Sequence, residues 1–197
     1  MNTETPQPFT AKMLKNVMLC LSKDITRPTL MGARLRITSP GVCQIGATDG
    51  HIAIVYENVC LTSVRDLFKI EYGVSLKEVS GNELREYIVH PDHKLRQKAG
   101  KKIVETDDVY PNLENAIPLE RDCLSDVNHF PVFHIDILQT VKKITGCLVY
   151  LPDYWKGADG ATVKKIDSYG SVLLVMPVRA DKEWAHYNAW RGRNASN

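Results

Sequence analysis

Residues 47–56 read Ala47-Thr48-Asp49-Gly50-His51-Ile52-Ala53-Ile54-Val55-Tyr56, a short polar turn that leads directly into an apolar stretch. Asp-Gly is a strong tight-turn dipeptide, because Asp bonds its own backbone and Gly accepts a positive φ at little cost. The preceding residues 42–46 also have the composition of a strand. The stretch therefore predicts a β-hairpin, with Thr48 and His51 at the rim of a sheet where two strands meet.

The composition is that of an ordinary globular protein. Of 197 residues, 44% are hydrophobic and 24% are charged, which is enough to bury a core in one large domain. The net charge of +2 does not indicate nucleic-acid binding, so any affinity for DNA has to come from how lysine and arginine are distributed. Five scattered cysteines without a Cys-x-x-Cys pair favour reduced thiols. The polar N-terminus contains no apolar segment, so we expect a cytoplasmic protein with no membrane partner.

The residues before the turn complete a unit of one helix and three strands. Thr10 is a candidate N-cap, and apolar residues recur every three or four positions over 13–21, which predicts a helix. Pro28 follows, and proline disfavours the α conformation in the residue before it. Alternation over 34–38 predicts a strand, followed by the strands at 42–46 and 52–56. One amphipathic helix is thus expected to cover a small antiparallel sheet.

The last third of the chain repeats this order. Helical spacing over 137–144, with Gly146 as a stop, precedes three predicted strands at 148–151, 162–167 and 172–178. Between the two units, residues 63–70 and 82–88 predict short helices, and residues 90–102 a loop. Two prolines bracket 110–118, which predicts an extended connector outside the core. The expected organisation is a flexible start at 1–8, one domain at 9–179 with an insertion at about 58–109 and a connector at 110–118, and a tail at 180–197.

Two segments together resemble hallmarks of the bacterial DNA polymerase sliding clamp, the β processivity subunit. They are Ala47-Thr48-Asp49-Gly50-His51 and Val175-Met176-Pro177-Val178-Arg179, and Tyr110-Pro111-Asn112-Leu113 to Pro118 resembles the interdomain connector of the same family. The resemblance covers residues 9–57 and 110–179. It implies an α+β DNA clamp fold, in which a helix-plus-three-strand unit occurs twice and antiparallel sheets carry helices on one face. Family chains hold three such domains, so a ring here requires a homo-oligomer with head-to-tail contacts, and the reduced size suggests a phage-type clamp.

The resemblance also implies a hydrophobic pocket for the short peptide motifs of DNA polymerases and clamp loaders. The expected pocket residues are Thr48, Gly50, His51, Ile52, Val175, Met176, Pro177 and Val178. In the family an arginine commonly follows the histidine, and Ile52 stands there in this chain, so we expect no charge at that rim. Asp66-Leu67-Phe68 resembles the Asp-Leu-Phe ending of the peptides that clamps bind, although such a pattern on a helix is usually core.

The function implied is that of a non-enzymatic processivity factor in DNA replication, with no cofactor and no metal, which tethers partners to double-stranded DNA. Its expected DNA-binding residues are Lys12, Lys15, Lys23, Lys142 and Lys143. These lysines either follow phosphates without reading sequence or form an ordinary solvated surface. Two alternatives remain open: a clamp-fold protein-interaction adaptor that does not encircle DNA, and a hydrolytic enzyme that uses Asp49, His51 or the His90/His93 pair, the last of which is also the candidate for metal binding.

The tail continues beyond the point where clamp chains end. Trp184, Tyr187 and Trp190 recur every three residues and are followed by Arg191 and Arg193. Such a segment either stacks on single-stranded bases or docks its aromatic face on the protein body. We expect the second, over or near the pocket.

Overall fold

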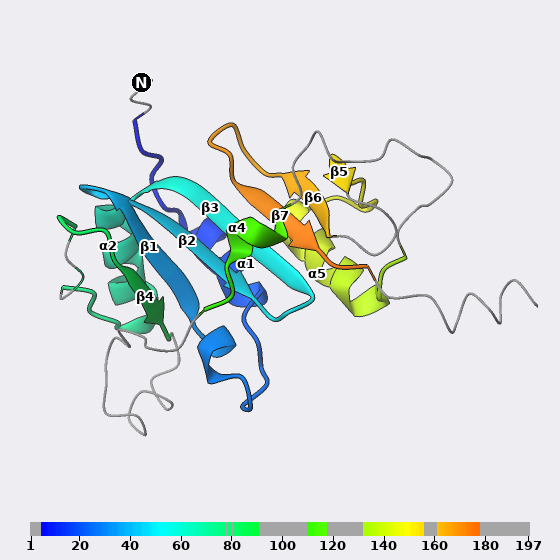
Figure 1. Cartoon of the computed structure of the whole chain (residues 1–197), viewed down its shortest axis with the longest axis horizontal. Coiled ribbons are helices and arrows are strands. Elements are labelled where there is room, and N and C mark those ends of the chain that lie inside the picture. Colours follow the sequence, from blue (N-terminus) through cyan, green and yellow to red (C-terminus); the bar gives the residue numbers. More distant parts are fainter. Residues whose placement is uncertain are drawn as a thin grey trace, which may run out of the picture.

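A single antiparallel sheet of seven strands organises the computed structural model of the chain (Figure 1), which describes residues 5–77, 79, 81–90, 110–117, 132–155 and 161–177. The strand order is β4-β1-β2-β3-β7-β6-β5. The strands are β1 (Ala33–Ser39), β2 (Val42–Thr48), β3 (Ile52–Cys60), β4 (Glu86–Val89), β5 (Tyr154–Trp155), β6 (Thr162–Lys165) and β7 (Val172–Val175). The helices are α1 (Ala11–Leu19), α2 (Leu61–Tyr72), α4 (Leu113–Ala116) and α5 (Ile135–Thr145), with a 3-10 turn at Pro28–Met31.

Two similar units build this sheet. In the first, α1 precedes β1, β2 and β3, and in the second, α5 precedes β5, β6 and β7. The pairing of β3 with β7, from Ile52 opposite Val175 to Val55 opposite Val172, joins the units at the centre. The predicted α+β architecture, with a helix-plus-three-strand unit that occurs twice, is therefore confirmed.

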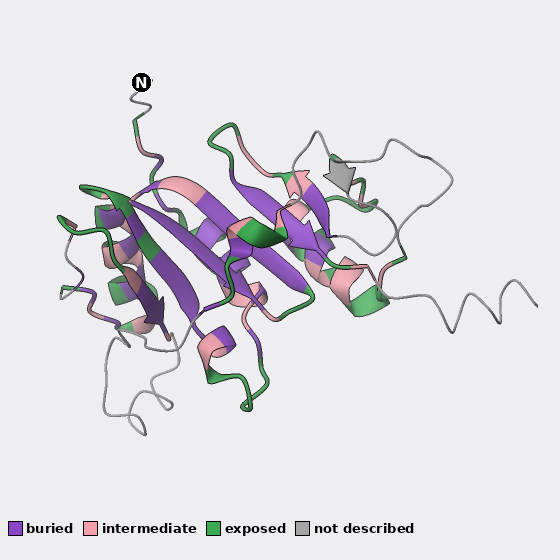
Figure 2. Cartoon of the chain, viewed as in Figure 1, coloured by how far each residue is buried: buried purple, intermediate pink, exposed green. Residues whose placement is uncertain are grey.

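The helices α1, α2 and α5 pack on one face of the sheet and form the larger core with it (Figure 1). Helix α1 begins at the predicted N-cap, where the Thr10 hydroxyl accepts a hydrogen bond from the Met13 amide at 3.3 Å. The apolar face of α1 is buried, and Val17 is completely enclosed. Figure 2 shows the central strands, which these helices cover, largely in purple, that is, buried. The helices therefore lie on one face, as expected.

The connector covers the opposite face of the sheet, where Figure 1 shows α4 lying across the central strands. Tyr110 and Leu113 are buried in a second, smaller core with residues of β3 and β7. Leu113 approaches β2 closely, because its Cδ1 lies 3.1 Å from where a Cβ on Gly46 would stand. The prediction that this segment lies outside the core is wrong, because its large side chains cover the apolar outer face of the strands.

A buried arginine also ties the connector to the sheet. The Arg34 guanidinium on β1 donates to Glu86 Oε2 at 2.9 Å and to Glu114 Oε2 at 3.0 Å, and Arg36 reaches Glu114 Oε1 at 3.0 Å. Burial by itself raises the pKa of Glu114, but the hydrogen bonds and charge of Arg34 outweigh it and hold the pKa at about 2. The cluster thus links β1, β4 and α4 by charge.

Three further local predictions are corrected by the structure. Residues 86–89 form an edge strand paired with β1 instead of a helix, because Tyr87, Ile88 and Val89 are all buried there. Residues 148–151 form no strand: Leu148 and Val149 are 83% and 67% exposed and have no apolar layer to cover. The predicted short helix at 63–70 is present, and longer, as α2.

Residues from the expected flexible start and from the expected insertion make contacts with the main domain. Gln7, within the start expected to be flexible, is buried and forms a parallel β-bridge with Val59 of β3. The region expected as an insertion contributes α2 and β4, and Phe68 of α2 is fully buried in the larger core. Leu67 and Phe68 of the Asp-Leu-Phe segment therefore belong to core packing, whereas Asp66 is exposed. Most of the 90–102 loop, the end of the connector, Val178 and the tail lie outside the described residues.

Candidate functional site

The turn at residues 48–52 is held by its own side chains. Asp49 Oδ1 accepts hydrogen bonds from the backbone amides of His51 and Ile52 at 2.8 and 2.9 Å. The Thr48 hydroxyl accepts from the Gly50 amide at 3.0 Å and donates to the Ile52 carbonyl at 2.9 Å. Gly50 has a φ of 96°, a conformation that strains residues with a Cβ. Asp49 and Thr48 therefore shape the turn, and the pairing of Asp49 with His51 for acid-base catalysis finds no support in this geometry.

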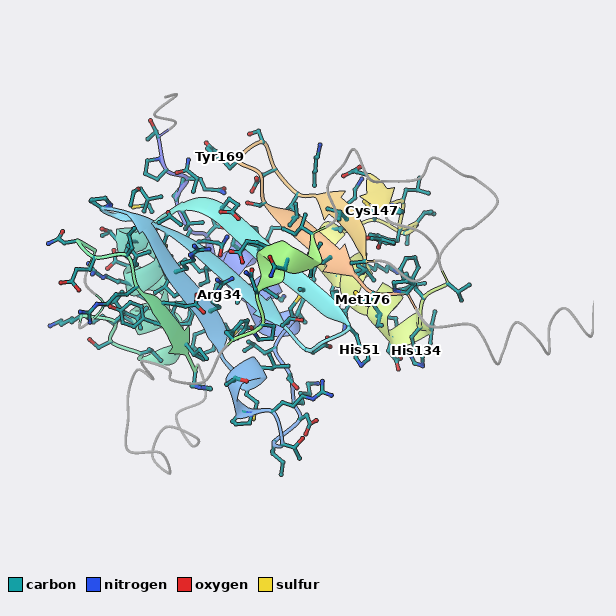
Figure 3. All side chains as sticks on the ribbon, in the orientation of Figure 1. Arg34, His51, His134, Cys147, Tyr169 and Met176 are labelled. Atoms are coloured by element: carbon teal, nitrogen blue, oxygen red, sulfur yellow. The ribbon has the colours of Figure 1, made fainter. Side chains whose placement is uncertain are left out.

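The structure brings the turn together with the end of β7. The Met176 amide donates a hydrogen bond to the His51 carbonyl at 2.8 Å, which continues the β3–β7 ladder by one step. His51 is exposed and Met176 is 37% exposed, and Figure 3 shows both at one end of the fold. Pro177 follows, half-buried. The two segments singled out in the sequence thus form one surface.

The other expected pocket residues do not all lie on this surface. Thr48, Ile52 and Val175 are buried, with Val175 completely enclosed, so they lie beneath the surface and support it. Gly50 is exposed at the tip of the turn. Val178 falls outside the described residues.

The guanidinium of Arg27 lies at the turn, although Ile52 occupies the position where clamps commonly have an arginine. The Arg27 Nη1 atom lies 3.1 Å from where a Cβ on Gly50 would stand. The Arg27 side chain is 56% exposed, and its Nε is 3.8 Å from Asp24. The expectation of an uncharged rim is therefore wrong, because the segment before the 3-10 turn folds back against the hairpin. Adjacency in the sequence gives no signal for this contact.

Three residues that the sequence analysis missed form a chain of contacts from the end of β7 to the segment before α5, namely the buried Thr162 and the half-buried Tyr150 and Phe133. The Thr162 hydroxyl on β6 donates to the Val175 carbonyl at 3.0 Å and lies 2.8 Å from the Tyr150 hydroxyl. Burial raises the pKa of Tyr150 to about 12. The Tyr150 ring in turn packs edge-on against Phe133, with ring centroids 5.3 Å apart. These contacts join segments that are distant in the chain.

Exposed aliphatic side chains lie next to Phe133 and Tyr150 in the chain. Val132, Ile135 and Leu151 are 41%, 62% and 59% exposed, and each is within two residues of Phe133 or Tyr150. Figure 3 places His134, between Val132 and Ile135, at the same end of the fold as His51 and Met176. We call the whole set the turn-end surface, which consists of His51, Met176, Pro177, Phe133, Tyr150, Val132, Ile135 and Leu151. It is mainly apolar, with a cation and polar backbone at its edge.

The predicted DNA-binding lysines lie on or near the helix face of the sheet. Lys12 and Lys15 are exposed on α1, and Lys142 and Lys143 are exposed on α5, which contacts α1. Helix α1 ends at Leu19, so Lys23 is exposed beyond the helix and does not share a helix face with Lys12 and Lys15. The structure therefore gathers four of the five lysines on two adjacent helices.

A cavity of about 410 Å³ opens beside these helices. It is lined by α1, the end of α5 and β6 with the residues after it, and the side chains include Lys12, Lys164 and Lys165. Asn16 also lines the cavity, is buried, and donates a hydrogen bond to the Tyr56 hydroxyl at 2.8 Å. The lysines add positive charge to the helix face.

The described part of the chain offers few groups for catalysis or metal binding. No group of three or more His, Cys, Asp or Glu side chains that could hold a metal ion occurs among the described residues, and His93 lies outside them. Burial raises the pKa of the Cys43 thiol to about 12 and raises that of Cys20 as well, so neither is an activated nucleophile. Within the described residues, the helices are all too short or too polar to cross a bilayer.

Comparison with known proteins gives matches among solved structures. None of the family models and none of the curated proteins compared with the sequence matches it. A DNA polymerase sliding clamp from Pseudomonas aeruginosa, crystallised with a ligand, matches with a TM-score of 0.50 and 12% identity over 85% of this chain and 63% of the clamp chain. The DNA polymerase III subunit beta of the same organism gives 0.48 with 13% identity, over 91% and 68%. The beta subunit from DNA polymerase of Streptococcus pyogenes gives 0.45 with 12%, over 90% and 67%.

The first of these matches bears on the fold of the chain. The first match shows that the α+β arrangement of antiparallel sheet and helices is that of a sliding clamp, as the sequence resemblance implied. The chain spans less than two thirds of the length of that clamp. At this identity the likeness is one of fold, and the activity of this chain has to be argued from its own surfaces.

Proposed function

We propose that this protein is a sliding-clamp-like, DNA-tethering processivity factor that binds partner proteins through the turn-end surface. One observation carries the proposal: the hydrogen bond from Met176 to His51 joins, on a clamp fold, the two segments that resemble clamp hallmarks. The same surface is apolar and sits on a rigid sheet end. In this proposal the protein is a phage-type clamp that acts in the cytoplasm without catalysis.

The partner that fits this surface is a short peptide with aliphatic and aromatic anchors. Met176 offers an adaptable thioether, and the Phe133–Tyr150 pair, half-buried against the larger core, offers an aromatic edge. Small interfaces concentrate their binding energy in a few such anchors. DNA polymerases and other proteins with clamp-binding motifs are the proposed partners.

Duplex DNA is the second proposed partner, held along the helix face. Lys12, Lys15, Lys142 and Lys143 are exposed there on adjacent helices. Contacts of this kind go to phosphates and carry no sequence information. Encirclement would require several copies of the chain, joined head to tail through the two unlike edges of the sheet, β4 and β5.

Peptide binding is tested with a fluorescein-labelled peptide that ends in Asp-Leu-Phe, measured by anisotropy against the full chain. Replacing Met176→Ser is expected to weaken binding by about tenfold or more, since it removes an anchor contact. Tyr169→Ser is the matched control: Tyr169 has the same exposed fraction, 37%, and Figure 3 shows it at a distant part of the fold. Equal affinities of the native chain and M176S would refute the proposed site.

DNA tethering is tested by retention on circular and linear duplexes at several salt concentrations. Replacing the four helix lysines by alanine is expected to abolish retention and to flatten its salt dependence. Light scattering gives the solution mass in the same buffer. A monomer that binds the peptide but is not retained on circular DNA would instead support the adaptor that does not encircle DNA, an alternative that the net charge of only +2 keeps open.

A further inference from the structure

We propose that the C-terminal tail of this chain, residues 181–197, docks on the turn-end surface and competes there with partner peptides. The competition rests on the proposed function of this surface, whereas the docking does not. The occupant is thus a segment of the same chain, and the surface is regulated from within.

The position where the described chain ends supports this assignment. Its last residues, Met176 and Pro177, are themselves part of the turn-end surface, with Met176 bonded to His51. Twenty residues follow, and the first tryptophan among them is Trp184. The seven residues from 178 to 184 span at most about 25 Å when extended, so the aromatic residues begin within reach of the surface.

The turn-end surface exposes apolar side chains against which an apolar segment can pack. Met176, Val132, Leu151 and Ile135 expose between 37% and 62% of their area. Val132 and Leu151 are the chain neighbours of Phe133 and Tyr150, whose rings pack together, and Thr162 links the Tyr150 hydroxyl to the end of β7. Monomeric proteins rarely leave a continuous apolar patch uncovered, and such patches mark interaction sites.

The tail carries the complementary chemistry in its sequence. Trp184, Tyr187 and Trp190 recur at three-residue intervals, so a helical tail would present them as one stripe. Lys182 falls on the side of the same helical pattern that faces away from the centre of this stripe. Tryptophan and tyrosine are the residues that most often anchor small interfaces. The stripe therefore matches an apolar surface bordered by polar groups.

Covalent attachment makes even a weak contact effective. A short tether places the tail at an effective concentration in the millimolar range, so an intrinsic dissociation constant of about 1 mM already occupies about half of the surface. A partner peptide has to displace the tail, and its apparent affinity falls by the fraction of surface that is covered.

Docking is measured directly with a labelled synthetic peptide of residues 180–197. The receptor is the full chain with W184A, Y187A and W190A, whose own tail cannot compete. We expect saturable binding that is lost when Met176→Ser and Ile135→Ser are added; Ile135 is 62% exposed, so its replacement spares the core. No binding at about 1 mM peptide, or binding that is unchanged by these two substitutions, would overturn the docking.

Competition is measured with the Asp-Leu-Phe peptide. The chain with the three aromatic replacements is expected to bind it about tenfold more tightly than the native chain, if the tethered tail covers about nine tenths of the surface. The control K182A, on the side of the tail that faces away from the aromatic stripe, is expected to match the native chain. Equal affinities of the native chain and the aromatic variant would overturn the competition.

The two proposals fail in distinguishable ways. If the tail peptide binds and the Asp-Leu-Phe peptide binds no variant, the proposed partner binding is refuted and the docking stands. If M176S weakens binding of the Asp-Leu-Phe peptide, the native chain and the aromatic variant bind that peptide equally, and the tail peptide does not bind, the docking is refuted and the proposed function stands.

Discussion

Replacement of Arg34 by methionine tests whether charge holds the connector on the sheet. Arg34 is 5% exposed and contacts Glu86 and Glu114 at 2.9 and 3.0 Å. Methionine is apolar and flexible enough to fill most of the same space, so packing is largely retained while both carboxylates lose their buried partner. The change should therefore destabilise the fold through Glu86 and Glu114.

The magnitude follows from the pKa of Glu114. An ordinary glutamate has a pKa of about 4.3, so a folded-state pKa of about 2 contributes about 3 kcal/mol to the free energy of unfolding at pH 7. The side chains of Glu86 and Glu114 are 35% and 30% exposed, and solvent screening reduces this to about 2 kcal/mol. Because the folded-state pKa is depressed, the contribution is fully present above the unfolded pKa and disappears as the pH falls through about 2. At pH 3 about 1 kcal/mol remains.

Urea unfolding at pH 7 and pH 3 measures this difference. We expect R34M to lower the free energy of unfolding by about 2 kcal/mol at pH 7 and by about half as much at pH 3. Arg36→Met is the control, because Arg36 is 48% exposed and contacts Glu114 alone, so its loss should cost less than about 1 kcal/mol. A loss for R34M that is identical at both pH values would refute the electrostatic reasoning and point to packing.

Three further predictions concern buried contacts, each measured by urea unfolding at pH 7. Gly46→Ala should destabilise by about 1–3 kcal/mol, because its Cβ would stand 2.9 Å from the Ile54 carbonyl, and an unchanged midpoint would show that the strands yield easily. Tyr56→Phe should cost about 1–3 kcal/mol by leaving the buried Asn16 amide without its acceptor, whereas adding Asn16→Leu should recover part of the loss. Thr162→Val should cost about 1–2 kcal/mol through two lost hydrogen bonds, and a stable variant would contradict their importance.

Local signals in the sequence were sufficient for the elements that begin and end within a few residues. The Asp49-Gly50 turn, the Thr10 cap and the Gly146 stop all act on neighbours in the chain, and each stands where it was predicted. The fold class followed from the order of such elements. The resemblance to clamps predicted that His51 and Met176 lie together, and the hydrogen bond between their backbones beside the β3–β7 ladder agrees with this.

Predictions failed where distant segments decide the structure. Tyr110 and Leu113 are buried because they meet the outer face of the sheet, and no pattern within 110–118 contains that face. The helical spacing over 82–88 was coincidental, since the free edge of β1 captures residues 86–89 as a strand. Arg27 reaches the turn by a chain reversal that sequence spacing does not encode. The tail and the pocket role of His51 and Met176 stay predictions for the experiments above.

The central position of β7 has a consequence for biosynthesis. Strand β3 gains its second neighbour only from residues 172–175, more than a hundred residues later in the chain, so the contact order of the fold is high and closure of the sheet is expected to be slow. Until β7 is synthesised, β3 presents an open edge with apolar residues such as Ile52 and Ile54. A nascent or prematurely terminated chain that lacks β7 is therefore the aggregation-prone form of this protein, and a chaperone would act at that stage.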